Sequence, residues 1–373
     1  MVMTDGTVLI DHEVKISLYG GIEMDLPQKS FSIRFAEGDL QTRLFDDSER
    51  TSFGSLLLRN SSSDAVDTHI RDCLTASLLG DCGTEILYTR SRNVALYING
   101  QYWGLYQLEE SLDTTWAAYT LGVDADSAAV LDASGRNTIL GTSADKEAYA
   151  ELIDHIKSCP PCESDDALSY LLERVDADAY IRFMAVWIFL GNSDQTTLRI
   201  ARGADGRWQY VWTDSTWCMV NAAYDSAASC TDPKGMGSAR VDDTVFLALL
   251  QVPGFREAFL TELGRLYRYL TSERMISFVD AAADEIRGEM MLHCVRWRNE
   301  DYSLFDPRTE GLDANGAYQY WLSRIERLRN TCRRRPAFVW SQIQAAFGLS
   351  DEELQRYFGD APASWQDIID DVP

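Results

Sequence analysis

The first third of the chain alternates between apolar and polar positions with the period of β-strands. Residues 14–18 and 31–35 each place an apolar side chain at every second position, which is typical of half-buried strands. The apolar run at 56–58 predicts a further, buried strand. The segment after it carries Ile70, Leu74 and Leu78 at helical spacing, so a helix is expected there.

A β-hairpin is predicted near residue 100. Two alternating runs, 93–98 and 102–108, flank the pair Asn99-Gly100. Asn-Gly between alternating runs is a strong local signal for a tight hairpin turn.

From about residue 145 onward the apolar positions follow the period of helices. Asp176 and Asp178 can cap a helix that runs to Gly191 and is apolar almost all round, so we expect it to be buried. Further helices are predicted near 253–270, 273–300, 316–334 and 336–347. The segment from Ser350 onward is acidic and polar, which indicates a frayed tail.

Strands first and helices later predict an α+β fold with two lobes. We expect one domain over residues 1–349, with a β-rich N-lobe over about 1–140 and a mainly helical C-lobe over about 141–349. Residues 350–373 would then form an acidic C-terminal tail.

Composition and charge exclude several classes of function. Among 373 residues, 46% are hydrophobic and 25% charged, which is ordinary for a globular protein. With 34 basic and 58 acidic residues, the formal charge is −24; this argues against nucleic-acid binding and against docking on an anionic membrane. The excess of acidic side chains keeps the protein soluble, or it attracts divalent cations or basic protein substrates. No apolar run approaches the roughly 20 residues of a membrane helix.

The cysteines leave the cellular compartment open. Their even number, eight, fits the disulfides of an exported protein or the thiols of a cytosolic enzyme. Cys159-Pro-Pro-Cys162 has the spacing of a redox motif, but it follows a predicted helix, which favours a disulfide that staples a loop. No signal peptide is visible after Met1, so either a leader is missing from the sequence or the protein is not exported.

Two aspartates are predicted to converge beside a second hairpin. Residues 197–202 and 207–213 flank a turn at 203–206. If the strands pair symmetrically, position 195 faces position 214, and Asp194 and Asp214 lie at the open end of one ladder. Carboxylates so close repel unless a cation or proton lies between them. The pair is therefore a metal site or an acid/base pair; the alternative is two surface aspartates at loop ends.

A lysine and a glutamate in the N-lobe extend this set. Lys29 lies two residues before Phe31 on the apolar side of a strand, where an ammonium needs an anion, unless the strand begins at Ser30 and Lys29 lies in solvent. Glu110, just past the strand that ends near Leu108, could supply the opposite charge or cap a helix. A lysine, a glutamate and two aspartates are the minimal set of active-site residues of an ATP-dependent kinase.

Several stretches of the chain, from about residue 7 to 347, resemble the CotH (spore-coat protein H-like) family in order and spacing. The most specific of them leads to Glu110 and is Val94-Ala-Leu-Tyr-Ile-Asn-Gly-Gln-Tyr-Trp-Gly-Leu-Tyr106. The others are Leu26-Pro-Gln-Lys-Ser-Phe31, Leu57-Leu-Arg-Asn60 with Arg71-Asp72, Gly191-Asn-Ser-Asp194, Trp208-Gln-Tyr-Val-Trp-Thr-Asp214, Arg296-Trp297, Trp321 and Arg335-Pro336.

The resemblance implies an atypical protein-kinase fold, ATP with Mg²⁺ or Mn²⁺, and a protein substrate with a Ser or Thr acceptor. Lys29 would then be the nucleotide lysine with Glu110 as its partner, Asp194 the catalytic aspartate and Asp214 the metal-binding one. Where family members have an asparagine soon after the first aspartate, this chain has Thr197. Where they often have a second acid two residues after the metal aspartate, it has Thr216.

Three functions follow as hypotheses. The first is an active kinase for exported, cell-surface or spore-coat proteins, itself extracellular or on the cell surface. The second is a pseudokinase that keeps the fold as a binding module, because threonine is a poorer metal ligand than asparagine or aspartate. The third is metal-dependent hydrolysis of a phosphate ester by the same aspartates.

Overall fold

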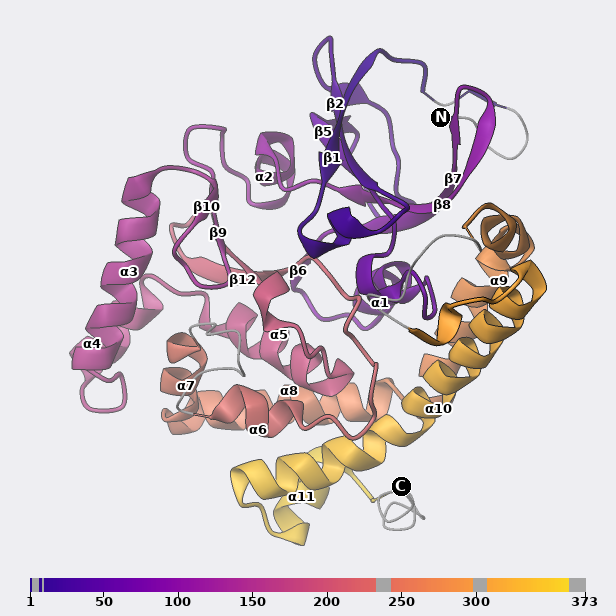
Figure 1. Ribbon diagram of the computed structural model, residues 1–373. Coiled ribbons are helices and arrows are strands. Elements are labelled where there is room, and N and C mark those ends of the chain that lie inside the picture. Colours follow the sequence, from indigo (N-terminus) through magenta and orange to yellow (C-terminus); the bar gives the residue numbers. More distant parts are fainter. Residues whose placement is uncertain (2–6, 9, 233–242, 298–306, 362–373) are drawn as a thin grey trace. The chain divides into compact units, whose positions relative to one another are not determined.

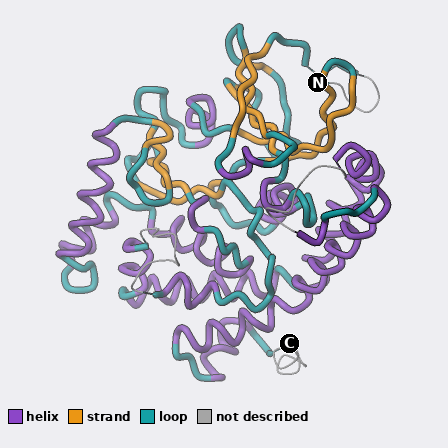
Figure 2. The backbone as a smooth tube through the Cα atoms, in the orientation of Figure 1, coloured by secondary structure: helices purple, strands orange, loops and turns teal. Residues whose placement is uncertain are grey.

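The computed structural model describes the chain except for residues 2–6, 9, 233–242, 298–306 and 362–373. The chain forms two compact units. The first comprises Met1–Ala76, Thr89–Ala125 and Asp280–Glu326, and the second comprises Ser77–Tyr88, Asp126–Val279 and Arg327–Pro373. Three helices run from one unit into the other: α1 (Arg71–Asp81), α9 (Ser272–Trp297) and α10 (Ala314–Phe347). Strands are concentrated in the N-terminal part of the chain and helices in the C-terminal part, as expected for an α+β protein. Figure 2 distinguishes the strands from the helices by colour.

The first unit contains a five-stranded antiparallel sheet in the order β1-β2-β5-β8-β7 (Figure 1). The hairpin predicted at Asn99-Gly100 joins β7 to β8. The strands of the sheet are β1 (Val14–Tyr19), β2 (Ser30–Phe35), β5 (Ser55–Arg59), β7 (Ser91–Ile98) and β8 (Gln101–Glu110). The shorter elements of this unit are η1 (Ile22–Asp25), β3 (Leu40–Gln41), β4 (Ser52–Phe53), η2 (Ser62–Asp64), α2 (Thr114–Thr120) and η5 (Pro307–Thr309).

The two faces of this sheet differ in polarity. Apolar side chains from alternate positions of β2, β5 and β8 pack against β3 and β4 in one core, whose members include Leu40, Phe53, Leu56, Leu58 and Leu108. Because side chains alternate along a strand, the positions between them point to the opposite face. There the side chains of Arg59, Gln107 and Glu109 are polar and buried.

A pair of buried histidines makes the first unit sensitive to acid. The ring centroids of His69 and His293 lie 4.8 Å apart. Burial lowers the pKa of His69 to about 4, from an ordinary value of 6.5, and holds the pKa of His293 well below that ordinary value. Protons therefore bind the unfolded chain more readily, so stability present above pH 6.5 is lost as the pH falls toward 4. For His69 alone, we expect the free energy of unfolding to fall by about 2 kcal/mol between pH 7 and pH 5.

Urea unfolding of wild type and His69→Asn at these two pH values measures the effect. Asparagine suits this position because residue 69 has a positive φ of 62°, which asparagine tolerates better than most residues. The pH dependence should be smaller in His69→Asn. An equal loss of stability in both proteins would contradict the assignment to this pair.

The second unit contains a five-stranded sheet in the order β10-β9-β11-β12-β6, in which only β6 runs parallel to its neighbour among the described strands. The strands are β6 (Leu87–Tyr88), β9 (Ala129–Asp132), β10 (Thr138–Leu140), β11 (Arg199–Arg202) and β12 (Trp208–Trp212). The described helices that lie within this unit are α3 (Ser143–Ser158), α4 (Asp165–Leu172), α5 (Ala177–Leu190), η3 (Gln195–Thr197), α6 (Ser226–Thr231), α7 (Thr244–Leu250), α8 (Pro253–Tyr269) and α11 (Asp351–Phe358).

Helix α5 is the centre of the second unit, as its apolar sequence predicts. The Asp176 side chain caps it by accepting a hydrogen bond from the Ala179 amide. Twelve of its residues are buried, and it packs against α8, α6, α7 and β12. Phe183 and Trp187 of α5 contact Trp212 of β12 with ring centroids 5.8 and 4.6 Å apart. The end of α5 and the end of β12 are therefore held together by an aromatic core.

One prediction for the C-terminal helices is corrected. Pro336 does not divide two helices, because α10 continues through it; buried Ala337, Phe338 and Trp340 anchor the following turns, and this packing outweighs the hydrogen bond that proline removes. Helix α9 matches the predicted 273–300 helix as far as Trp297. Residues 298–300 lie outside the described residues.

The predicted tail begins with a folded helix. Ser350 and Glu353 form a capping box at the start of α11, and Leu354, Tyr357 and Phe358 are buried. The helix packs against α8, with the rings of Tyr267 and Phe358 centred 5.0 Å apart. Its apolar stripe therefore outweighs the acidic composition that indicated a tail; residues 362–373 lie outside the described residues.

Gly264→Ala tests the packing of α11 on α8. A Cβ at Gly264 would overlap the main-chain carbonyl of Tyr357. We expect the variant to lose about 1–3 kcal/mol in urea unfolding, the usual cost of overpacking. Gly254→Ala is the matched control in the same helix, because no atom lies within 4 Å of its added Cβ and alanine favours helix. Equal stability of the two variants would contradict this packing.

Candidate functional site

The candidate site lies on two loops of the second unit. The first loop follows α5, which ends at Gly191 in the left-handed conformation with φ 64°; Asp194 then caps η3. The second loop follows β12 and carries Asp214. Both aspartates therefore come directly after buried regular elements, as the sequence predicts.

The register of the hairpin between these loops differs by one residue from the prediction. Arg202 pairs with Trp208 and Arg199 with Val211, so position 196, not 195, is in register with position 214. The turn is longer than expected because the Gly203 amide donates to the Arg207 carbonyl (2.9 Å), and Gly206 adopts a φ of 81°, which glycine allows without strain. The loops still meet at the open end of the ladder.

Each aspartate is oriented by a threonine two residues later. Asp194 Oδ1 accepts hydrogen bonds from the amide (3.0 Å) and the hydroxyl of Thr196. Asp214 Oδ1 accepts in the same way from the amide (2.9 Å) and the hydroxyl (2.8 Å) of Thr216. These local bonds fix the rotation of each carboxylate. Thr216, predicted as a weakened metal ligand, therefore orients the aspartate that precedes it.

Asn192 connects the two loops. Its Oδ1 accepts from the Asp194 amide at 3.0 Å, and its Nδ2 donates to the Asp214 carbonyl at 3.0 Å. The side chain is buried, with 1% of its surface exposed. The structure thus brings Asp194 and Asp214 to adjacent loops, whose main chains the Asn192 amide group bridges.

Thr197 stabilises the same junction through its main chain and hydroxyl. Its hydroxyl donates to the Asp194 carbonyl (2.8 Å), and its own carbonyl accepts from the Thr213 hydroxyl (2.7 Å). Its hydroxyl is therefore engaged with the main chain in the place where family members have an asparagine.

Hydrogen bonds from buried polar side chains stabilise the segments around both loops. Gln195 donates to Tyr224 Oη (3.1 Å) and Ser229 Oγ (3.2 Å). Arg335, fully buried, donates to the Ile188 carbonyl at the end of α5 (2.6 Å) and to the Tyr224 carbonyl (2.7 Å). Burial lowers the pKa of Arg335 to about 10, so the guanidinium stays charged at neutral pH.

The donor set suits a magnesium–nucleotide complex better than a metal held by protein alone. Within the described residues, no cluster of three or more His, Cys, Asp or Glu side chains could hold a metal. Mg²⁺ prefers oxygen ligands and is commonly held by one or two carboxylates together with phosphates and water. Asp214, with Asp194 on the adjacent loop, fits that requirement, and Asp194 Oδ2 accepts no hydrogen bond from the described residues.

Lys29 lies in the first unit, just before β2, which begins at Ser30. Its ammonium donates to the Met24 carbonyl at 2.7 Å in an exposed hydrogen bond, and its carbonyl accepts from the Tyr106 hydroxyl at 2.9 Å. The alternative in which the strand starts at Ser30 is therefore the one that the structure shows. The role of Lys29 toward nucleotide stays a prediction.

The predicted pairing of Glu110 with Lys29 is wrong. Glu110 is buried and forms ion pairs with Arg50 (2.9 Å) and Arg90 (3.6 Å). In the sheet it is in register with Ile33 across β5, four positions from Lys29, a step of roughly 13 Å along the strand. Arg50, 60 residues away in sequence, takes the place that was expected for Lys29.

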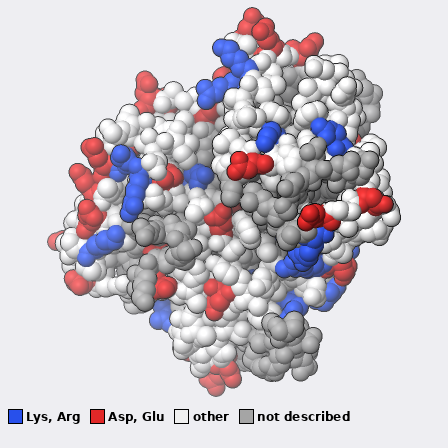
Figure 3. Space-filling view, viewed as in Figure 1, with Lys and Arg blue, Asp and Glu red and all other residues white. Residues whose placement is uncertain are grey.

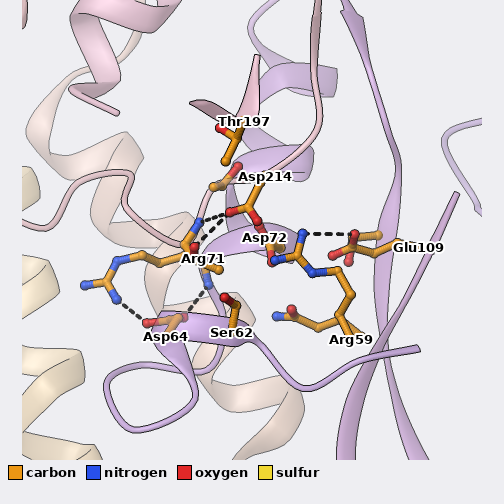
Figure 4. A network of polar contacts seen from close by, with 12 residues as sticks. Arg59, Ser62, Asp64, Arg71, Asp72, Glu109, Thr197 and Asp214 are labelled. Atoms are coloured by element: carbon orange, nitrogen blue, oxygen red, sulfur yellow. Dashed lines mark hydrogen bonds and ion pairs between the residues drawn. The ribbon is translucent and has the colours of Figure 1, made fainter. Parts of the chain in front are cut away.

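Arg59 is a buried cation that the sequence analysis did not single out. It ends β5 and lies 3.8 Å from Asp72 of α1 and 3.6 Å from Glu109 of β8, an arrangement shown in Figure 4. A strand cation paired with an acid on a helix holds the nucleotide phosphates in protein kinases. Arg59 is therefore a second candidate for that role, and its sequence signal was the arginine that follows the apolar run at 56–58.

Comparison with protein-family models assigns the chain to a family. Two aspartates on adjacent loops, in an α+β chain with a β-rich N-terminal part, are features of a kinase-like protein. The family model described as CotH kinase protein matches residues 16–339, which is most of the chain. The chain therefore belongs to the CotH kinase protein family. A search of curated proteins found no match, and no helix within the described residues is long and apolar enough to cross a membrane.

Proposed function

We propose that this chain is an ATP- and metal-dependent protein kinase with an atypical, two-lobed kinase fold. The observation that carries the proposal is the pair of oriented aspartates on adjacent loops, in a member of the CotH kinase family. Asp194 orients the attacking hydroxyl, and Asp214 holds Mg²⁺ or Mn²⁺ with the ATP phosphates. Catalysis of phosphoryl transfer depends mainly on such positioning and on charge neutralisation.

In this proposal the terminal phosphoryl group of ATP moves to a Ser or Thr hydroxyl of a protein substrate. The hydroxyl loses its proton as the new P–O bond forms and the bond to the departing ADP breaks. Asp194 Oδ2 is the acceptor available for the hydroxyl hydrogen. Lys29 or Arg59 would supply the cation for the nucleotide phosphates, and Mg²⁺, when bound, would supply further charge neutralisation.

The substrate class, exported, surface or spore-coat proteins, rests on the family alone. No disulfide joins Cys159 and Cys162, so the predicted loop-stapling disulfide is not formed and adds no support for export. Acidic and basic side chains are interspersed on the face shown in Figure 3, so the described part of that face offers no single acidic patch for a basic substrate. An extracellular or cell-surface location belongs to the same proposal.

A pseudokinase is the second candidate. The observation that favours it is the engagement of the Thr197 and Thr216 hydroxyls in hydrogen bonds at the site, where the family commonly has better metal ligands. Such a protein would bind nucleotide and metal without transferring phosphate. It would serve as a surface or structural binding module.

Incubation of the purified chain with γ-labelled ATP, Mg²⁺ or Mn²⁺, and dephosphorylated casein as a general acceptor tests the proposal. We expect label on Ser or Thr of the casein or of the chain itself. Binding of ATP with metal but no label on protein would favour the pseudokinase. Release of free phosphate without protein label would favour phosphate-ester hydrolysis, and neither binding nor label would overturn the proposal.

A further inference from the structure

The Asn192 side chain hydrogen-bonds to the main chain of both loops. It lies immediately after Gly191, and its amide group bridges the Asp194 amide and the Asp214 carbonyl, each at 3.0 Å. Both contacts are to main chain, so the bridge uses no carboxylate oxygen of either aspartate. Two other hydrogen bonds also join the loops, from the Ser193 amide to the Trp217 carbonyl (3.3 Å) and from the Thr213 hydroxyl to the Thr197 carbonyl (2.7 Å). The Asn192 bridge joins the main chains of the two aspartates themselves and leaves the acids to act on a ligand.

The chemistry of the bridge requires an amide. One end must accept a hydrogen bond from an N–H group, and the other must donate to a carbonyl oxygen; asparagine has both on one planar group. Aspartate of the same shape has no donor at neutral pH, and alanine has neither group. Because Asn192 is buried, with 1% exposed, losing the bridge leaves a buried position without its hydrogen bonds and the Asp214 carbonyl without this donor.

The bridge complements the two threonine contacts. Thr196 and Thr216 fix how each carboxylate is rotated about its own chain, but they do not fix one aspartate relative to the other. A metal–phosphate complex held by two loops requires both, since site geometry must be kept within about 0.5 Å. Asn192 supplies such a constraint between the main chains of the two aspartates.

We propose that Asn192 is a positioning residue that sets the spacing of Asp194 and Asp214 for one complex of a divalent cation with a nucleoside triphosphate. The inference rests on the proposed nucleotide–metal site but not on phosphoryl transfer itself. It applies equally to a kinase and to a pseudokinase that binds nucleotide.

Two variants separate the bridge from the charge. Asn192→Asp keeps the size and the acceptor for the Asp194 amide, removes the donor to Asp214 and adds a negative charge that would by itself strengthen binding of a cation. Asn192→Ala removes the bridge and adds no charge. We expect both to weaken the affinity for Mn²⁺ with ATP at least tenfold, measured by calorimetry, because both lose the bridge.

Asn221→Asp is the matched control. Asn221 is exposed and its Oδ1 accepts from the amide two residues later, that of Ala223, at 3.0 Å, as Asn192 does with Asp194. It has no described bridge to the other loop. The control should bind Mn²⁺ with ATP within twofold of wild type, and the ligand-free Tm of Asn192→Asp should show whether fold is preserved.

The outcomes distinguish the two claims. Wild-type affinity in both Asn192 variants would overturn the positioning role and leave the proposed function standing. Stronger binding by Asn192→Asp with weaker binding by Asn192→Ala would show that charge dominates, which also contradicts the inference. No binding of Mn²⁺ with ATP by the wild type would overturn the proposed function and the inference with it. Binding that weakens in both variants, with or without protein labelling, supports the inference.

Discussion

Asp194→Asn and Asp214→Asn should each lower the rate of phosphoryl transfer to protein at least about a hundredfold, the lower end of what a positioned proton acceptor contributes. Asparagine keeps the size of each side chain and an oxygen that can accept from Thr196 or Thr216. It removes the negative charge that attracts the metal at position 214 and the proton acceptor at position 194. The loss should therefore appear in activity and not in stability.

The measurement is the initial rate of label transfer from ATP at saturating Mg²⁺, with a urea unfolding curve for each protein. Asp178→Asn is the matched control, because Asp178 is an exposed aspartate near the start of α5 in the same unit. It should retain wild-type activity. Rates within threefold of wild type in either site variant would contradict the assignment of that aspartate.

Arg335→Met should have the largest effect on stability. The guanidinium donates to the carbonyls of Ile188 (2.6 Å), Phe189 (2.8 Å), Ala222 (2.9 Å) and Tyr224 (2.7 Å). Methionine fills similar space but leaves these acceptors without their donor, and each buried acceptor left unsatisfied costs about 1–3 kcal/mol. We expect a loss of about 4 kcal/mol or more in the free energy of unfolding.

Urea unfolding at pH 7 measures this loss, with Arg333→Met as the control on the same helix. Arg333 is exposed, and substitution of such a surface residue changes stability by roughly 0.5 kcal/mol or less. If Arg335→Met does not accumulate as folded protein, Arg335→Lys, which keeps the charge and some donors, should be intermediate in stability. A loss below about 1 kcal/mol in Arg335→Met would contradict the role of Arg335 in holding the end of α5.

The parts of the fold that the sequence predicted are those fixed by local pattern. The hairpin at Asn99-Gly100, the capped and buried helix that ends at Gly191, and the strand that leads to Asp214 were all predicted correctly. The periodicity of apolar residues and the residues that favour turns are local features, so they can be recognised in a single sequence. The same local logic placed Asp194 and Asp214 on neighbouring loops, although the hairpin register was wrong by one residue because a longer glycine turn replaced the symmetric one.

The predictions that were wrong or incomplete concern contacts between residues far apart in sequence. Glu110 was assigned to Lys29, but its partner is Arg50, and no local pattern links Arg50 to the end of β8. Arg335 was noticed only as part of a family motif, and its carbonyl partners lie more than a hundred residues away. Asn192 lies in a motif that was noticed, but only the structure shows that it bridges two loops.

One failure was avoidable from the sequence. Ser350 followed three residues later by Glu353 is a capping-box signal, and it precedes Leu354, Tyr357 and Phe358 at helical spacing. Acidic composition alone indicates a tail, but acids at the start of a helix favour helix formation. The segment became α11, not a tail.

The most direct test of the central claim is to locate the metal. A crystal of the chain grown with Mn²⁺ and a non-hydrolysable ATP analogue gives an anomalous-scattering signal at each manganese position. We predict a manganese ion coordinated by the Asp214 carboxylate at roughly 2.1 Å, the distance usual for a small divalent cation, and by phosphate oxygens of the analogue, with the loop of Asp194 beside it. A manganese ion bound away from Asp214, or none bound at all, would contradict the account.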